Sequence, residues 1–257
     1  MGRVRVLRQL FAALLIVAGL AVACANKTES GAVHIVTADA DVGPVLEQYI
    51  DRALDRAEEN DARLVVIRLD TPGGLSTSMR DIVQRIEASK VPVAVYVWPP
   101  GGRAASAGTF ITMAGHLAVM APNTSIGAAS AINSDGSDIQ GTLGRKVEND
   151  AVAFIRGIAD LRGRNAGWAE QAVREAVAVD QAEAVRLDVV DYVATDLEDL
   201  LRQADGRQVE VQPGRIVSLA GVAASPRVYT DMTVWERVLY VLANPTLPSI
   251  LLAIGFF

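Results

Sequence analysis

Residues 99–111 read Pro99-Pro100-Gly101-Gly102-Arg103-Ala104-Ala105-Ser106-Ala107-Gly108-Thr109-Phe110-Ile111. They follow an apolar run, 91–98, that is typical of a buried strand, and Ser106 stands where a helix is predicted to begin. A hydroxyl at a helix start lies near free backbone N–H groups and the positive end of the helix dipole, both of which stabilise an oxyanion. Serine is also a common helix cap. This stretch alone therefore leaves two interpretations of Ser106 open, a nucleophile or a cap.

The same succession of strand, turn and helix recurs on both sides of this stretch. A Gly73-Gly74 turn joins one predicted strand to the helix that follows it. Apolar runs predict strands at 33–36, 64–69, 91–98, 117–120 and 125–128, and apolar spacing of three and four predicts helices at 75–88, 146–161 and 166–176. Such alternation predicts an α/β domain of repeated strand-helix units with largely parallel strands.

Composition and charge exclude several classes of function. Of the 257 residues, 51% are hydrophobic and 21% are charged, which is typical of a folded chain. The net charge of −6 and the absence of a basic cluster argue against a nucleic-acid partner. One cysteine allows no internal disulfide and no cysteine metal site, and no nucleotide-binding motif occurs. We therefore expect no metal and no cofactor.

Both ends of the sequence suggest a membrane. Arginines precede an apolar run, 10–25, that is shorter than the roughly 20 residues needed to span a bilayer, so we interpret 1–25 as a signal peptide or N-terminal anchor. This places the rest of the chain on the extracytoplasmic side. Lipidation of Cys24 is an alternative. We interpret 231–257 as an amphipathic helix followed by the start of a truncated transmembrane segment at 248–257, although this segment could instead pack on the domain. A hairpin around Pro213-Gly214 predicts a small β appendage over 206–230.

A nucleophilic Ser106 would need a base, and the sequence offers few. His116 lies ten residues after Ser106, ~15 Å along a helix axis, so it is a poor partner. His34 lies in the first predicted strand, where a packed or edge residue is expected, and the sequence leaves a pair with Ser106 open. Arginine does not deprotonate in proteins, which leaves three lysines as cationic candidates. Lys146 opens an amphipathic helix after a turn-rich loop, and it is either the base or an ordinary solvated lysine.

Four motifs then resemble a known family as an ordered set. They are Asp70-Thr71-Pro72-Gly73-Gly74, Lys90-Val91-Pro92-Val93, Pro99-Pro100-Gly101 with Ala104-Ala105-Ser106-Ala107-Gly108-Thr109, and Met120-Ala121-Pro122-Asn123-Thr124-Ser125-Ile126-Gly127-Ala128. The set resembles the long-form NfeD family of membrane-bound serine proteases, part of the Clp protease and crotonase superfamily and similar to signal peptide peptidase A. The resemblance covers 33–205 and implies a Clp protease-like serine protease domain there.

The resemblance also implies the site. By it, Ser106 is the nucleophile and Lys146 the general base of a Ser-Lys dyad, and the N–H groups of Gly74 and Ala107 form the oxyanion hole. It further implies substrate contacts at two positions, Gly73 and Ile126.

Two departures from related patterns limit the resemblance. Ala104 replaces the first glycine of a G-x-S-x-G elbow, which the family does not demand. Residues 128–131 contain no histidine, so a Clp-type triad is not available.

The family implies a hydrophobic polypeptide substrate, in particular a stomatin-like membrane protein, and a homo-oligomer, a dimer or higher. Two other functions stay open at this point. One is a crotonase-like acyl-CoA enzyme, which shares the oxyanion hole but has no serine nucleophile. The other is a non-catalytic scaffold for membrane proteins.

Overall fold

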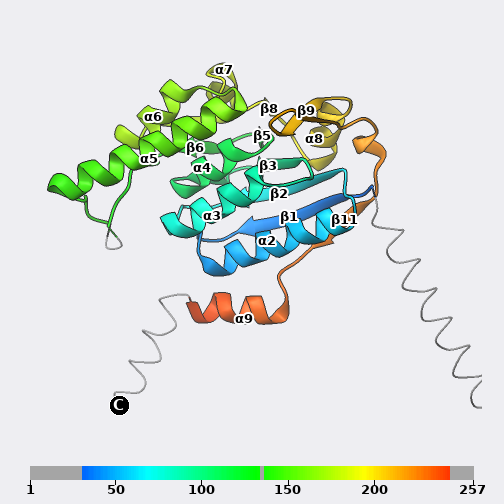
Figure 1. Ribbon diagram of the computed structural model, residues 1–257, viewed down its shortest axis with the longest axis horizontal. Helices are drawn as coiled ribbons and strands as arrows, with labels where there is room; N and C mark the ends of the chain where they lie inside the picture. Colours follow the sequence, from blue (N-terminus) through cyan, green and yellow to red (C-terminus); the bar gives the residue numbers. More distant parts are fainter. Residues whose placement is uncertain (1–30, 134–135, 244–257) are drawn as a thin grey trace, which may run out of the picture.

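The computed structural model describes residues 31–133 and 136–243, in which a parallel sheet is covered by helices on both faces (Figure 1). The six strands of this sheet lie in the order β11-β1-β2-β3-β5-β8, and every neighbouring pair is parallel. Their bounds are β1 Val33–Asp39, β2 Leu64–Asp70, β3 Val93–Val97, β5 Leu117–Met120, β8 Tyr192–Val193 and β11 Arg227–Thr230. The predicted α/β class and parallel sheet are confirmed.

Smaller β elements stand beside the main sheet. A three-stranded sheet, β4-β6-β7, lies at its carboxyl edge, and a two-stranded antiparallel hairpin, β9-β10, forms a separate unit. Their bounds are β4 Arg103–Ala105, β6 Ser125–Gly127, β7 Ala178–Asp180, β9 Gln208–Gln212 and β10 Arg215–Ser218.

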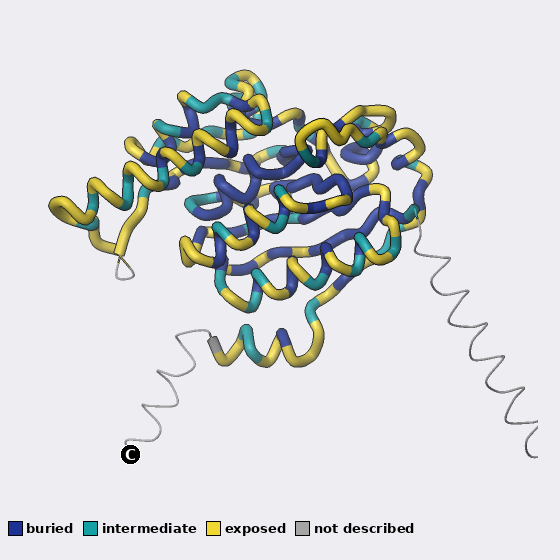
Figure 2. Tube along the Cα trace, in the orientation of Figure 1, coloured by how far each residue is buried: buried dark blue, intermediate teal, exposed yellow. Residues whose placement is uncertain are grey.

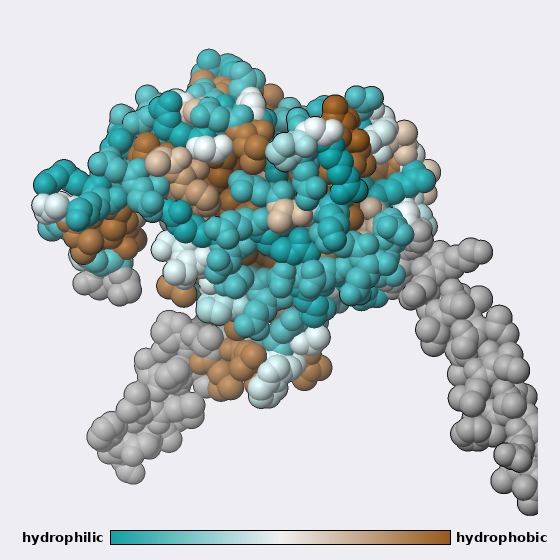
Figure 3. All heavy atoms as spheres, in the orientation of Figure 1, coloured by the Kyte–Doolittle hydropathy of each residue, from teal (hydrophilic) through white to brown (hydrophobic). Residues whose placement is uncertain are grey.

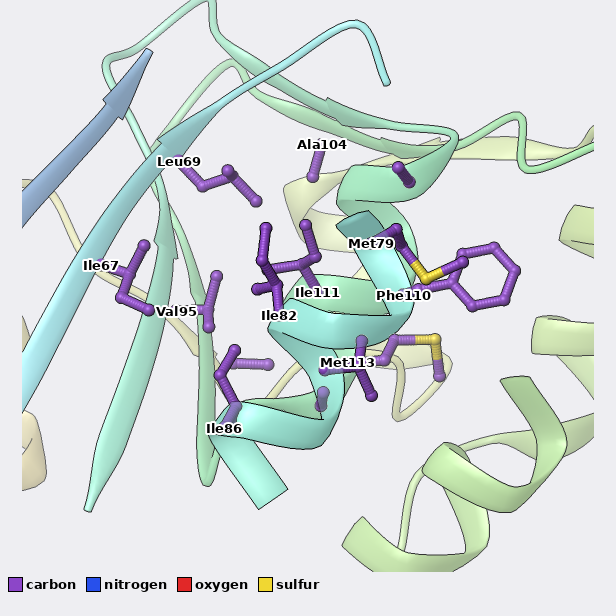
Figure 4. Packing of buried hydrophobic residues seen from close by; sticks show 14 of the residues in the cluster. Ile67, Leu69, Met79, Ile82, Ile86, Val95, Ala104, Phe110, Ile111 and Met113 are labelled. Atoms are coloured by element: carbon purple, nitrogen blue, oxygen red, sulfur yellow. The ribbon is translucent and has the colours of Figure 1, made fainter. Parts of the chain in front are cut away.

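Helices cover the sheet because their apolar faces pack on its continuous apolar strands. The bounds of the helices are α2 Pro44–Glu59, α3 Ser76–Glu87, α4 Ala107–Ala114, α5 Gly141–Arg162, α6 Ala166–Arg174, α7 Gln181–Arg186, α8 Leu197–Ala204, the short 3-10 helix η1 Val222–Ala224, and α9 Val234–Ala243. The larger core lies under α2 to α6, and the smaller core lies on the opposite face under α8, η1 and the hairpin. In Figure 4, Ile82 of α3 and Ile111 of α4 face Val95 of β3, so α4 packs between a neighbouring helix and the sheet.

The predicted domain boundaries stay predictions, but residues 206–230 are divided between two β structures. The hairpin forms at 208–218, whereas β11 pairs with β1 and belongs to the main sheet. Residues 206–230 are therefore not one separate appendage. The pairing of β11 with β1 could not be predicted from local sequence, because β11 is four residues long and β1 lies almost 200 positions earlier in the chain.

The predicted membrane segments, 1–25 and 248–257, lie outside the described residues. Within 31–133 and 136–243, none of the helices combines the length and the apolar character that crossing a bilayer requires.

Candidate active site

Ser106 occupies a sharp turn between β4 and α4. Its backbone has φ +53° and ψ −115°, a conformation that residues other than glycine rarely adopt and that costs about 1–3 kcal/mol. Its N–H donates to the Gly127 carbonyl oxygen at 3.0 Å. The Ser106 side chain caps no N–H group of α4, although the residue holds the cap position. The cap interpretation is therefore wrong, and a half-buried hydroxyl is held at a helix start by an unfavourable backbone conformation.

The hydroxyl of Thr109 stabilises this turn from within. It is fully buried and lies 3.0 Å from the carbonyl oxygen of Ala104 and 2.9 Å from that of Gly127, to which it can donate its one proton. It also accepts the N–H of Gly127 at 3.2 Å. One side chain thus ties β4 and β6 to the first turn of α4.

The Gly73-Gly74 turn faces Ser106 at a distance that only glycine allows. A Cβ on Gly73 would lie 2.7 Å from the Cβ and 3.1 Å from the Oγ of Ser106, and Gly73 has φ +121°. A Cβ on Gly74 would lie 2.1 Å from the Val42 carbonyl oxygen, at φ +153°. Both glycines are needed because backbone must approach backbone and the serine side chain here.

The backbone donors of this turn differ in availability. The N–H of Gly73 donates to Thr71 Oγ1 at 3.2 Å, and the N–H of Leu75 donates to the Val42 carbonyl oxygen at 2.8 Å. Across the described ranges, the N–H groups of Gly74 and Ala107 have no acceptor. Ala107 is the first residue of α4, where the N–H has no partner within the helix. Gly74 and Ala107 therefore offer two free donors beside the serine.

Lys146 does not meet Ser106 in this structure. The sequence predicted a helix from 146, but α5 begins at Gly141, so Lys146 lies in the second turn and is exposed. No hydrogen bond or ion pair among the described residues joins Lys146 to Ser106 or to an acidic side chain. Figure 1 shows the amino-terminal part of α5 extending beyond the sheet. The predicted dyad stays a prediction.

Ile126, the second predicted substrate contact, is buried in this structure. Its side chain in β6 is 1% exposed and belongs to the larger core. In this structure Ile126 is therefore part of the core, and its predicted contact with a substrate stays a prediction.

Neither histidine belongs to the site. His116 Nδ1 accepts the Val93 N–H at 3.1 Å, and its Nε2 lies 3.1 Å from the Val211 carbonyl oxygen. Burial lowers the pKa of His116 to about 4, with a further contribution from Arg162. His34 is buried in β1. Across the described ranges, no three acidic, histidine or cysteine side chains gather as a metal ion would require.

Known proteins match this chain in sequence and in fold. Residues 32–214 match the family model described as NfeD1b, N-terminal domain. The membrane-bound protease PH1510 of Pyrococcus horikoshii is 37% identical over 211 residues, which are 80% of this chain and 47% of that protein. The chain thus spans about half the length of this relative.

Solved structures of the Pyrococcus horikoshii domain named 1510-N agree with the fold. A lysine-to-alanine mutant of this stomatin-specific protease, in complex with a substrate peptide, has 34% identity and a TM-score of 0.76, covering 83% of this chain and 98% of that one. A serine-to-alanine mutant has 35% identity and a TM-score of 0.74, covering 79% and 99%. ClpP1 from Listeria monocytogenes, at 18% identity and a TM-score of 0.53 over 65% of this chain and 94% of that one, shares the fold.

Proposed function

The chain belongs to the NfeD1b N-terminal domain family, and from this premise we propose that it is a membrane-associated serine endopeptidase with Ser106 as nucleophile and Lys146 as general base. The observation that carries the proposal is the backbone of Ser106. In a nucleophile elbow, a serine stands in a strained backbone conformation between a strand and the start of a helix. Ser106 has this arrangement, with φ +53° and a hydroxyl that makes no capping hydrogen bond to α4.

The chemistry follows from the groups around this serine. Ser106 Oγ attacks the scissile carbonyl carbon while its proton passes to the neutral amine of Lys146. The N–H groups of Gly74 and Ala107 stabilise the oxyanion, and the dipole of α4 adds to them. The Lys146 ammonium then protonates the leaving amine, and a water molecule activated by the same amine releases the acyl group from Ser106.

The pairing with Lys146 requires α5 to approach Ser106 when substrate binds. The relative supports this choice of residues, because its mutated serine and lysine occupy positions 97 and 138 of that chain. That spacing is 41 positions, compared with 40 between Ser106 and Lys146.

The proposed substrate is a hydrophobic segment of a membrane protein, such as a stomatin-like protein. The relative is described as specific for a stomatin homologue. Beside the Gly73-Gly74 turn, Leu75 exposes 55% of its surface, and Leu143 near Lys146 exposes 64%. Exposed aliphatic side chains beside the turn and on α5, which would approach Ser106 when substrate binds, favour an apolar peptide. We place the domain on the extracytoplasmic side because the arginines at 3, 5 and 8 precede the apolar run at 10–25.

Covalent labelling tests the proposal directly. The full chain in vesicles is treated with a fluorophosphonate, the modified residue is identified by mass spectrometry, and cleavage of an apolar peptide is measured in parallel. We expect label on Ser106, and a fall of at least 100-fold in both signals for Ser106→Ala and Lys146→Arg, on the order of the loss of a catalytic base. Lys90→Arg is the matched control, since Lys90 is exposed and lies in the turn before β3.

The alternatives give different results. A crotonase-like acyl-CoA enzyme leaves the serine unlabelled and turns over a thioester. A scaffold shows neither label nor cleavage. Full cleavage by Lys146→Arg removes the dyad, because an arginine cannot accept the proton.

A further inference from the structure

Helix α9 exposes a mainly apolar face, while its one acidic residue, Glu236, is buried against the protein. Val234, Val238, Val241 and Leu242 follow the i, i+4, i+7, i+8 spacing of one helical face, and all are exposed. Trp235 extends this face and is 67% exposed. Figure 2 shows α9 as mostly exposed, and Figure 3 shows its apolar atoms grouped at the lower edge of the molecule.

Specific contacts fix this orientation. Arg52 of α2 holds Glu236 through two hydrogen bonds of 2.9 and 2.7 Å, and it donates to the Asp231 carbonyl oxygen at 3.1 Å. The N–H of Thr233 donates to Glu236 at 2.6 Å, and the N–H of Glu236 donates to Thr233 Oγ1 at 3.2 Å, which makes a capping box. The hydrogen bonds from Arg52 lower the pKa of Glu236. The helix is thus locked with its acidic residue inward.

The inner side of α9 also reaches the site end of the sheet. Tyr240 packs against the larger core and lines an open, polar cavity of about 500 Å³ together with Pro72 and Arg103. Pro72 precedes the Gly73-Gly74 turn, and Arg103 lies three positions before Ser106. The exposed apolar face of α9 therefore lies on the helix that adjoins the candidate active site.

We propose that the apolar face of α9, formed by Val234, Trp235, Val238, Val241 and Leu242, inserts into the interfacial layer of a lipid bilayer and holds the Ser106 site next to the membrane surface. Exposure of an apolar helix face to water is unfavourable, and its burial in lipid is favourable. An apolar face with a tryptophan at its side is typical of an interfacial helix. The sequence that follows α9, 244–257, contains no charged residue, so the apolar character continues along the chain. The binding of α9 to lipid stands independently, while its effect on cleavage rests on the proposed function.

Quenching of Trp235 fluorescence tests the insertion without reference to activity. The full chain is reconstituted in vesicles of equal parts phosphatidylcholine and phosphatidylglycerol, with and without bromine atoms on the upper acyl chains. We expect brominated lipid to quench the emission of the wild-type chain, and this component to be absent from Trp235→Phe. The difference isolates Trp235 from Trp98 and Trp168, and the substitution is benign for folding because the side chain is exposed.

A charged residue on the face supplies the matched comparison. Val238→Asp should abolish the brominated-lipid quenching and lower cleavage of a bilayer-embedded peptide by roughly tenfold, with cleavage of a short soluble peptide unchanged. Ile216→Asp, at an exposed aliphatic position on β10, should change neither.

The outcomes separate the two proposals. Quenching of Trp235 in a chain that cleaves nothing retains the lipid contact and rejects the protease. Quenching of Trp235 by aqueous iodide but not by brominated lipid overturns the insertion. Protection from both quenchers, with a dependence on protein concentration, also overturns it and assigns the face to a second copy of the chain.

Discussion

Replacing Gly73 by alanine tests how closely the Gly73-Gly74 turn must approach Ser106. The added Cβ would lie 2.7 Å from the Ser106 Cβ, whereas ordinary contact begins at 3.4 Å, so one of the two segments has to move by about 0.7 Å. The φ of +121° adds strain of about 1–3 kcal/mol. A misplacement of this size in the oxyanion region costs on the order of 100-fold in rate.

We therefore expect Gly73→Ala to lose roughly 100-fold in fluorophosphonate labelling and in peptide cleavage, and about 1–3 kcal/mol in free energy of unfolding. Gly157→Ala is the control, since Gly157 is exposed in the middle of α5 with no neighbour within 4 Å, and it should gain up to about 1 kcal/mol. A Gly73→Ala chain that folds and labels at the wild-type rate would refute the close approach described here.

The backbone strain at Ser106 can be measured without any activity. Glycine adopts φ +53° freely and alanine does not, so Ser106→Gly should be more stable than Ser106→Ala by about 1 kcal/mol or more. Equal stability of the two variants in denaturant unfolding would mean that the turn is unstrained.

Three further results are expected. His116→Gln should flatten the pH dependence of the free energy of unfolding. Burial places the pKa of His116 in the folded state near 4, below the unfolded value of 6.5, so stability that is present above pH 6.5 is lost as the pH falls. Denaturant unfolding should show a loss of about 2 kcal/mol between pH 7 and 5 in the wild type and not in the variant. Thr109→Val should slow labelling of Ser106 by more than tenfold, and Thr109→Ser should restore it, because the hydroxyl positions the turn; similar rates for the two variants would contradict this. Glu236→Gln should increase hydrogen exchange in α9 several-fold, since it weakens a charge-assisted bond of about 1.5–3 kcal/mol, and unchanged exchange would show that the Arg52 contact does not hold the helix.

Most of the strand-helix alternation could be predicted because apolar periodicity is a local property. The runs at 64–69 and 117–120 became β2 and β5 almost residue for residue. The turn around Ser106 was located correctly, but its backbone conformation is held by hydrogen bonds to Gly127, which lies on a different element, β6. Local sequence could not distinguish a capping serine from a strained one for this reason.

The burial of Ile126 shows a second limit. A motif gives the neighbourhood of a residue along the chain, whereas the face of a three-residue strand is set by its partners β4 and β7. Similarly, the distance between Ser106 and Lys146 depends on how α5 lies in space, and sequence spacing contains no such information.

The pairing of β11 with β1 has a consequence for how this domain should be produced. The family match stops at residue 214, before β11 begins at Arg227. A fragment cut at that match would uncover the backbone of β1 over residues 33–36, the part that pairs with β11. Bare strands of this kind pair with other copies, so we expect the shortened fragment to aggregate and a fragment that continues through Thr230 to remain monodisperse.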